Sequence, residues 1–66
     1  MNYTYQNWET YQVRLFKEVT PNMSVSIAVY NKRKNRVYIG NISILTDDDV
    51  EAIKQFINEM RKKNEQ

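Results

Sequence analysis

The chain has 66 residues and a formal net charge of +2, and it contains neither cysteine nor histidine. A chain of this length forms one domain with a modest core. Without cysteine or histidine it has no thiol nucleophile, no imidazole acid–base group and no zinc site built from those ligands. We therefore expect a single domain over residues 1–66 that is not an enzyme and that holds no metal and no cofactor.

The first ten residues are polar and aromatic, with neither a basic start nor an apolar run, so we expect no signal peptide. No stretch approaches the ~20 apolar residues that span a bilayer, and we expect a cytoplasmic protein without membrane contact. Tyr3 and Tyr5 alternate with polar residues, which indicates either an edge strand or a loose arm over residues 1–10. Trp8 is too large an apolar surface to leave in water, so we expect it to pack in the core or to bind a partner.

Residues 7–18 fit two patterns. From Tyr11 onward their apolar side chains alternate with polar ones, as in a strand, but they also recur at three- and four-residue steps, as in a helix. Pro21 and Asn22 favour a turn directly afterwards, and a second alternating run follows that turn. This order favours a strand.

The clearest strand covers residues 23–30. We expect its odd-numbered apolar side chains, and those of the strand before it, to face a helix. The even-numbered side chains would then form a second, open face, which carries Gln12, Arg14, Phe16, Ser24, Ser26, Ala28 and Tyr30. One helix covers one face only, so this second face must meet solvent, a ligand or another subunit.

A basic turn follows over residues 31–36, and its cations are Lys32, Arg33, Lys34 and Arg36. The next strand is expected over residues 37–45. Its apolar residues change parity at Gly40 and Asn41, which indicates a β-bulge there.

A helix is expected over residues 47–63, because its start carries several local signals. Thr46 is an N-cap residue and Asp49 stands where a capping box places an acidic side chain. Leu45 and Val50 have the spacing of a hydrophobic staple. The expected apolar stripe consists of Val50, Ile53, Ile57 and Met60. The fold class is therefore α+β: an antiparallel meander of three strands, or four with residues 1–10, and one C-terminal helix packed on one sheet face.

The basic turn is the sharpest functional feature. Its cations can follow a phosphate backbone and release counterions, while Phe16, Tyr30 and Tyr38 offer stacking platforms for unpaired bases beside Arg14. The plainer alternative is a solvent-exposed hairpin turn whose charges serve solubility. The acidic run that ends at Asp49 fits the first turn of a helix better than it fits a cation site.

The order of strand, basic loop, strand and helix, with the run from Gly40 to Thr46 leading into Val50, Ile53 and Ile57, resembles the positive cofactor four family. These are small transcriptional-coactivator-like proteins that bind single-stranded DNA. The resemblance covers roughly residues 11–60, although Ile39 replaces a basic residue usual in the family, Asn41 is additional and the second loop is shorter. It implies a curved sheet, a homodimer formed partly through the helices, and a strand-binding channel at Arg14, Phe16, Tyr30, Lys32, Arg33, Lys34 and Arg36.

Two functions from different classes therefore stay open. The first is a nucleic-acid-binding module that prefers single strands and acts as a homodimer. The second is a small protein-interaction module or inhibitor, of the kind that mobile elements encode, in which Tyr5, Trp8 or the acidic helix start binds a partner protein.

Overall fold

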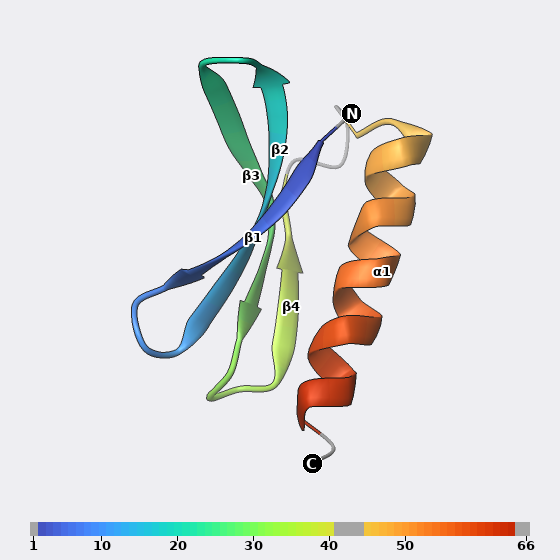
Figure 1. Ribbon diagram of the computed structural model, residues 1–66. Coiled ribbons are helices and arrows are strands. Elements are labelled where there is room, and N and C mark those ends of the chain that lie inside the picture. The colour runs from blue at the N-terminus through green and yellow to red at the C-terminus, as the bar shows by residue number, and fades with distance from the viewer. Residues whose placement is uncertain (1, 41–44, 65–66) are drawn as a thin grey trace.

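The computed structural model describes residues 2–40 and 45–64. They form an antiparallel sheet with strand order β1-β2-β3-β4, followed by one helix (Figure 1). The elements are β1 (Tyr3–Trp8), β2 (Gln12–Thr20), β3 (Met23–Asn31), β4 (Arg36–Ile39) and α1 (Asp47–Asn64). The predicted α+β meander is confirmed, and residues of the first ten supply its fourth strand. The helical alternative for residues 7–18 is wrong, because they contain the end of β1, a turn and much of β2.

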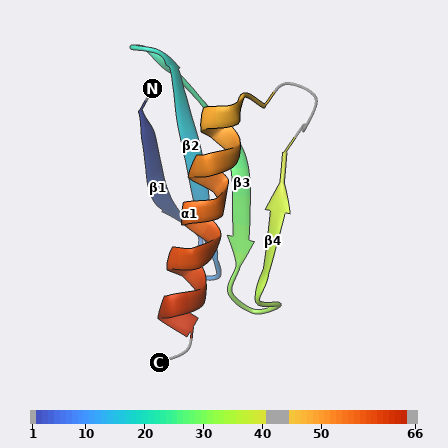
Figure 2. The same cartoon turned by 90° about the vertical axis from the view of Figure 1, so that its right-hand side faces the viewer.

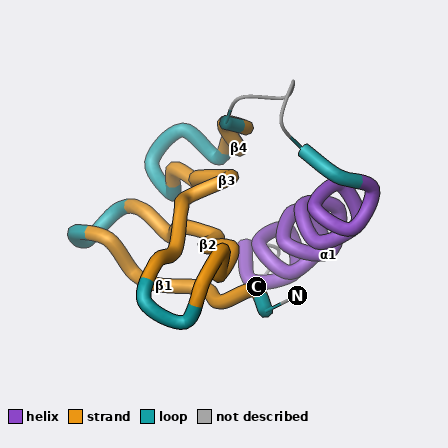
Figure 3. The backbone as a smooth tube through the Cα atoms, turned by 90° about the horizontal axis from the view of Figure 1, so that it is seen from above, coloured by secondary structure: helices purple, strands orange, loops and turns teal. Residues whose placement is uncertain are grey.

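The helix lies along one face of the sheet and leaves the other face uncovered (Figures 2 and 3). The core between the two layers consists of Val13, Leu15, Ile27, Ala28, Tyr30, Ile53, Phe56 and Met60. Tyr5 adds its ring to this core by packing edge-on against Phe56, with 5.2 Å between the ring centroids. None of the described residues belongs to a helix with the length and apolarity needed to cross a bilayer.

The buried stripe of α1 differs in part from the predicted one. Ile53 and Met60 are buried as predicted, but Phe56 is also fully buried and Val50 is 41 % exposed. The reason is that Asp49, one residue before Val50, is itself buried and held by the sheet. The face of α1 that meets the sheet therefore begins at Asp49 and continues through Ile53, which turns Val50 toward the flank of the helix.

The start of α1 is fixed by the predicted capping box. The Asp49 backbone N donates to Thr46 Oγ1 at 3.2 Å, and the Thr46 backbone N donates to Asp49 Oδ2 at 3.0 Å. The same carboxylate accepts a hydrogen bond from Tyr3 Oη at 2.6 Å and forms an ion pair with Lys17 Nζ at 2.9 Å. One buried side chain thus joins the first turn of α1 to β1 and β2.

A β-bulge in β3 overturns the predicted facing of its side chains. Leu15 of β2 pairs with Ala28, but Phe16 pairs with Ser26, so Ile27 is an extra residue without a direct partner. Beyond this point the even-numbered residues of β3 face the helix, and both Ala28 and Tyr30 are buried there. The prediction that Ala28 and Tyr30 lie on the open face is wrong.

The end of β4 lies close to this bulge. The Gly40 backbone N donates to the Ile27 carbonyl oxygen at 2.8 Å, and a Cβ atom at Gly40 would stand only 3.3 Å from that oxygen. Close backbone approach therefore accounts for the glycine. The strand β4 ends at Ile39, earlier than expected. Of the two residues of the predicted bulge, Gly40 follows the strand and Asn41 lies outside the described part of the chain.

Candidate functional site

The uncovered side of the sheet carries two rows of paired side chains. One row pairs Trp8 with Gln12, Gln12 with Asn31, and Asn31 with Arg36. The other pairs Gln6 with Arg14, Arg14 with Val29, and Val29 with Tyr38. Side chains at paired positions share a face. We define the open face by the larger of these side chains and by Phe16 in the next row: Trp8, Arg14, Phe16, Arg36 and Tyr38.

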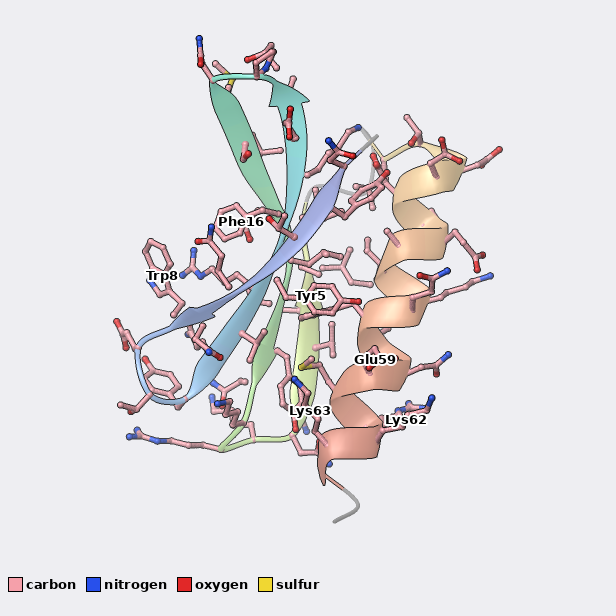
Figure 4. All side chains as sticks on the ribbon, viewed as in Figure 1. Tyr5, Trp8, Phe16, Glu59, Lys62 and Lys63 are labelled. Carbon is pink, nitrogen blue, oxygen red and sulfur yellow. The ribbon has the colours of Figure 1, made fainter. Side chains whose placement is uncertain are left out.

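Trp8, Arg14 and Phe16 form a contiguous cluster on the open face. The Arg14 guanidinium carbon lies 4.6 Å from the centroid of the Trp8 ring, a cation–π distance. The Trp8 and Phe16 rings lie 6.4 Å apart with their planes tilted by 47°, and both point away from α1 (Figure 4). The Trp8 side chain is 43 % exposed. A large ring thus stays in solvent contact while a cation holds its orientation.

Arg14 is the central charge of this cluster. Its Nη2 atom donates a long hydrogen bond of 3.4 Å to Gln12 Oε1. Its Nε atom is buried, and no described residue accepts a hydrogen bond from it. No carboxylate of the described residues forms an ion pair with Arg14. The positive charge of Arg14 is therefore available to an anion that approaches the open face.

Tyr38 extends the aromatic surface across the sheet. It lies in the same row as Arg14, with Val29 between them, and it is 47 % exposed. Three strands, β1, β2 and β4, therefore each contribute one ring to the open face: Trp8, Phe16 and Tyr38.

The basic turn between β3 and β4 is held by asparagine side chains. Asn31 Oδ1 accepts hydrogen bonds from the backbone N of Arg33 at 3.0 Å and of Lys34 at 3.1 Å. Asn35 adopts a φ of 52°, a left-handed conformation that asparagine tolerates, and its Oδ1 accepts from Tyr30 Oη at 2.9 Å. The turn backbone is fixed in this way while the charged ends of its side chains reach into solvent.

One cation of the turn is attached to the sheet. The Arg33 guanidinium carbon lies 4.5 Å from the centroid of the Tyr11 ring, and the Lys32 backbone N donates to the Tyr11 carbonyl oxygen at 2.8 Å. A hydrogen bond with Glu9 raises the pKa of Tyr11 above its ordinary value. The β1–β2 turn and the basic turn therefore form one rim of the sheet.

The predicted site residues divide into three groups. Arg14, Phe16 and Arg36 lie on the open face, and Lys32, Arg33 and Lys34 lie in the turn at its rim. Tyr30 does not belong to the site, because it is buried under α1.

The sequence analysis assigned Trp8 to the alternative protein-binding surface and gave Tyr11 no role, so neither residue belonged to the predicted nucleic-acid site. Their signal was the β1–β2 hairpin: once Trp8 pairs with Gln12, it shares a face with Arg14 and Phe16. The tilted packing of Trp8 on Phe16 depends on this register.

A second surface feature lies on the opposite side of the molecule, between β4 and the flank of α1. We define the apolar flank as Ile39, Leu45, Val50, Ile53 and Ile57, which with Lys54 line a depression of about 250 Å³. Leu45 and Val50, the predicted staple pair, both line it. The helix covers β2 and β3 more closely than β4 (Figure 2), and Ile39 and Val50 stay exposed while Ile53 is buried.

The acidic helix start has a structural role at Asp49. Its two carboxylate oxygens accept from Tyr3, Lys17 and Thr46. Burial by itself raises the pKa of Asp49, but the hydrogen bonds and the Lys17 charge outweigh burial and hold that pKa well below its usual range. Within residues 2–40 and 45–64, no three histidine, cysteine, aspartate or glutamate side chains gather where they could hold a metal ion.

Comparisons of the chain with protein-family models, with curated proteins and with solved structures found no match.

Proposed function

We propose that the protein binds single-stranded nucleic acid on the open face and along the basic turn. The observation that carries this proposal is the cluster of the exposed Trp8 and the half-buried Phe16 around Arg14, on a sheet face that none of the described elements covers. A domain of this size gains core by burying aromatic rings, and here Trp8 stays exposed instead. An exposed ring with a fixed orientation is a platform for a ligand that stacks.

Unpaired bases match this surface in both shape and charge. Each base presents a flat π-face, and stacking on an aromatic side chain contributes about 1–3 kcal/mol per base. The phosphates between bases are attracted to Arg14 and Arg36, and to the turn cations at the rim. A base inside a duplex has no free face for the rings, so the same surface discriminates against double strands.

The test is a titration of a fluorescently labelled, mixed-sequence single-stranded oligonucleotide, followed by anisotropy at several salt concentrations. We expect saturable binding. The logarithm of the association constant should fall linearly with the logarithm of the salt concentration, with a slope of about −0.7 per phosphate neutralised. The charge variant replaces Lys32, Arg33, Lys34 and Arg36 by Glu. It should remove binding at moderate salt without unfolding the domain, because these side chains are exposed.

The aromatic part of the proposal has its own variant and matched control. Tyr38→Ala should weaken binding at least about fivefold, the low end of one lost stacking contact. Met23→Ala removes another exposed apolar side chain, at the far end of β3, and it should leave affinity unchanged. Equal affinities of the two variants would refute stacking on Tyr38, and no binding of the wild type at low salt would refute the function.

The competing function is a protein-interaction module, and the apolar flank favours it. Its exposed aliphatic side chains, Ile39 and Val50 among them, offer the kind of surface that a protein partner buries. The same titration separates the two functions, because an oligonucleotide that does not bind at low salt leaves only a protein partner for the exposed surfaces.

A further inference from the structure

Two hollows lie side by side between the sheet and the last turns of α1. The first, of about 270 Å³, is lined by Asn7, Val13, Tyr30, Lys32, Met60 and Lys63. The second, of about 340 Å³, is lined by Tyr30, Asn35, Val37, Ile57, Met60 and Arg61. Because Tyr30 and Met60 line both, we treat the hollows as one feature, the helix-end cleft.

The charged groups that line the helix-end cleft are all cations. Lys32 reaches it from the basic turn, and Arg61 and Lys63 reach it from α1. No aspartate or glutamate is among the described residues that line either hollow. Like charges that share a cleft repel each other, and a bound anion removes that repulsion.

The helix dipole alone does not account for this arrangement. Arg61, Lys62 and Lys63 all stand in the last turn of α1, where cations offset the negative end of the dipole. The dipole does not require any of them to face the sheet, and Lys62 points away from it (Figure 4). Lys63 instead points toward the sheet (Figure 4) and lines the cleft with Lys32.

The basic turn connects the cleft with the open face. Lys32 lines the cleft, its neighbour Arg33 lies over Tyr11 at the rim, and Arg36 pairs with Asn31 in the row that holds Trp8. A strand that leaves the open face over this turn therefore meets cations continuously until it reaches the end of α1.

We propose that the helix-end cleft binds the phosphate backbone of the nucleic-acid strand that the open face holds, with Lys63 as the contact from α1 in the first hollow and Arg61 as the contact in the second. This inference rests on the proposed function and extends the path of the strand from one side of the sheet around its rim to the other. The extended path predicts that short strands use the open face alone and that longer strands also use the cleft.

The experiment compares two oligothymidylates, one of about 4 nucleotides and one of about 12 nucleotides. Single-strand-binding domains usually cover about 4–16 nucleotides, so the first is close to the shortest site and the second fills a longer one. Their affinities are measured for the wild type, for the double variant Arg61→Gln/Lys63→Gln and for the control Lys62→Gln. The three positions are exposed on α1, and circular dichroism confirms that each variant is folded. We expect the double variant to lose at least about fivefold in affinity for the long strand, and its salt slope to fall by about 0.7 per lost phosphate contact.

The outcomes separate this inference from the proposed function. Unchanged short-strand affinity with weakened long-strand affinity in the double variant alone supports the cleft. Lys62→Gln removes one charge, and the double variant removes two. If the loss of long-strand affinity per charge removed is the same in both, the effect comes from general charge. The cleft is then refuted, while binding on the open face stands. If the wild type binds neither strand, both proposals fall together.

Discussion

Replacement of Asp49 by Asn should destabilise the domain more than any other isosteric change on α1. Asp49 is 1 % exposed, and its carboxylate accepts from Tyr3 Oη, Lys17 Nζ and the Thr46 backbone N. An amide presents one acceptor oxygen in place of two and carries no charge. The ammonium of Lys17, whose side chain is only 13 % exposed, would then be left without its counter-charge.

The magnitude follows from the burial of this pair. Removal of one partner from a buried ion pair costs about 3–5 kcal/mol, and the partial exposure of Lys17 places the expected loss near 3 kcal/mol. A domain of 66 residues has a total unfolding free energy of roughly 3–10 kcal/mol. Asp49→Asn should therefore remove roughly a third of the stability at the upper end of this range and nearly all of it at the lower end.

The assay is urea unfolding followed by far-ultraviolet circular dichroism, with Asp48→Asn as the matched control. Asp48 is exposed in the same helical turn, where its charge interacts with the helix dipole for about 0.3–1 kcal/mol. A double-mutant cycle with Lys17→Met isolates the pair. If Asp49→Asn costs no more than Asp48→Asn, or if the cycle shows no coupling energy, the stabilising role assigned to the buried carboxylate is wrong.

The same carboxylate gives the domain an acid-sensitive stability. Because its pKa in the folded state lies below the unfolded value of about 3.9, its contribution is present above that value and is lost as the pH falls toward the folded pKa. Unfolding free energies of the wild type should decline below about pH 4 more steeply than those of Asp49→Asn. Parallel declines would contradict the depressed pKa.

Three further predictions concern other contacts of the chain. The hydrogen bond to Asp49, together with burial, raises the pKa of Tyr3 to about 12. The stability that this hydrogen bond contributes is therefore fully present below the unfolded pKa of about 10 and is lost as the pH rises to about 12. The unfolding free energy of Tyr3→Phe should thus fall less steeply at alkaline pH than that of the wild type, and equal pH profiles would count against the bond. Tyr30→Phe should cost about 1 kcal/mol, since it removes the hydrogen bond to Asn35, yet leave short-strand affinity unchanged; weaker binding would place Tyr30 at the ligand. The homodimer stays a prediction. If a second copy covers the apolar flank, sedimentation should give twice the monomer mass of 8.0 kDa, and Val50→Lys should restore the monomer. A monomeric wild type at micromolar concentration would refute the homodimer.

The parts of the fold that the sequence predicts correctly depend on local interactions. Thr46 and Asp49 cap the helix within one turn, and their hydrogen bonds follow directly from their spacing. The turn at Pro21 likewise separates two alternating runs that become β2 and β3. Such signals need no knowledge of what packs against them.

The errors arise where facing depends on a partner strand. No glycine or proline marks the extra residue at Ile27, and only its pairing with β2 shows that the alternation shifts there. That shift moves Tyr30 from the open face into the core. The place of Trp8 on the open face depends in the same way on the register of β1 against β2. The sequence of neither segment alone determines that register.

The burial of Phe56 depends on a tertiary contact as well. Both the expected stripe through Val50 and the observed one through Phe56 have helical spacing, and the contact of Asp49 with Tyr3 and Lys17 decides between them.

The buried contact between Tyr3 and Asp49 joins residues 46 positions apart, and it ties the first strand to the start of the helix, which lie near each other in Figure 1. Native proteins open locally in cooperative units, which amide hydrogen exchange resolves. An edge strand ordinarily frays on its own. Here β1 cannot leave the sheet while Tyr3 stays bonded to the first turn of α1. The amides of β1 and of that turn should therefore exchange with a common opening free energy, as a single unit that joins the first strand to the start of the helix.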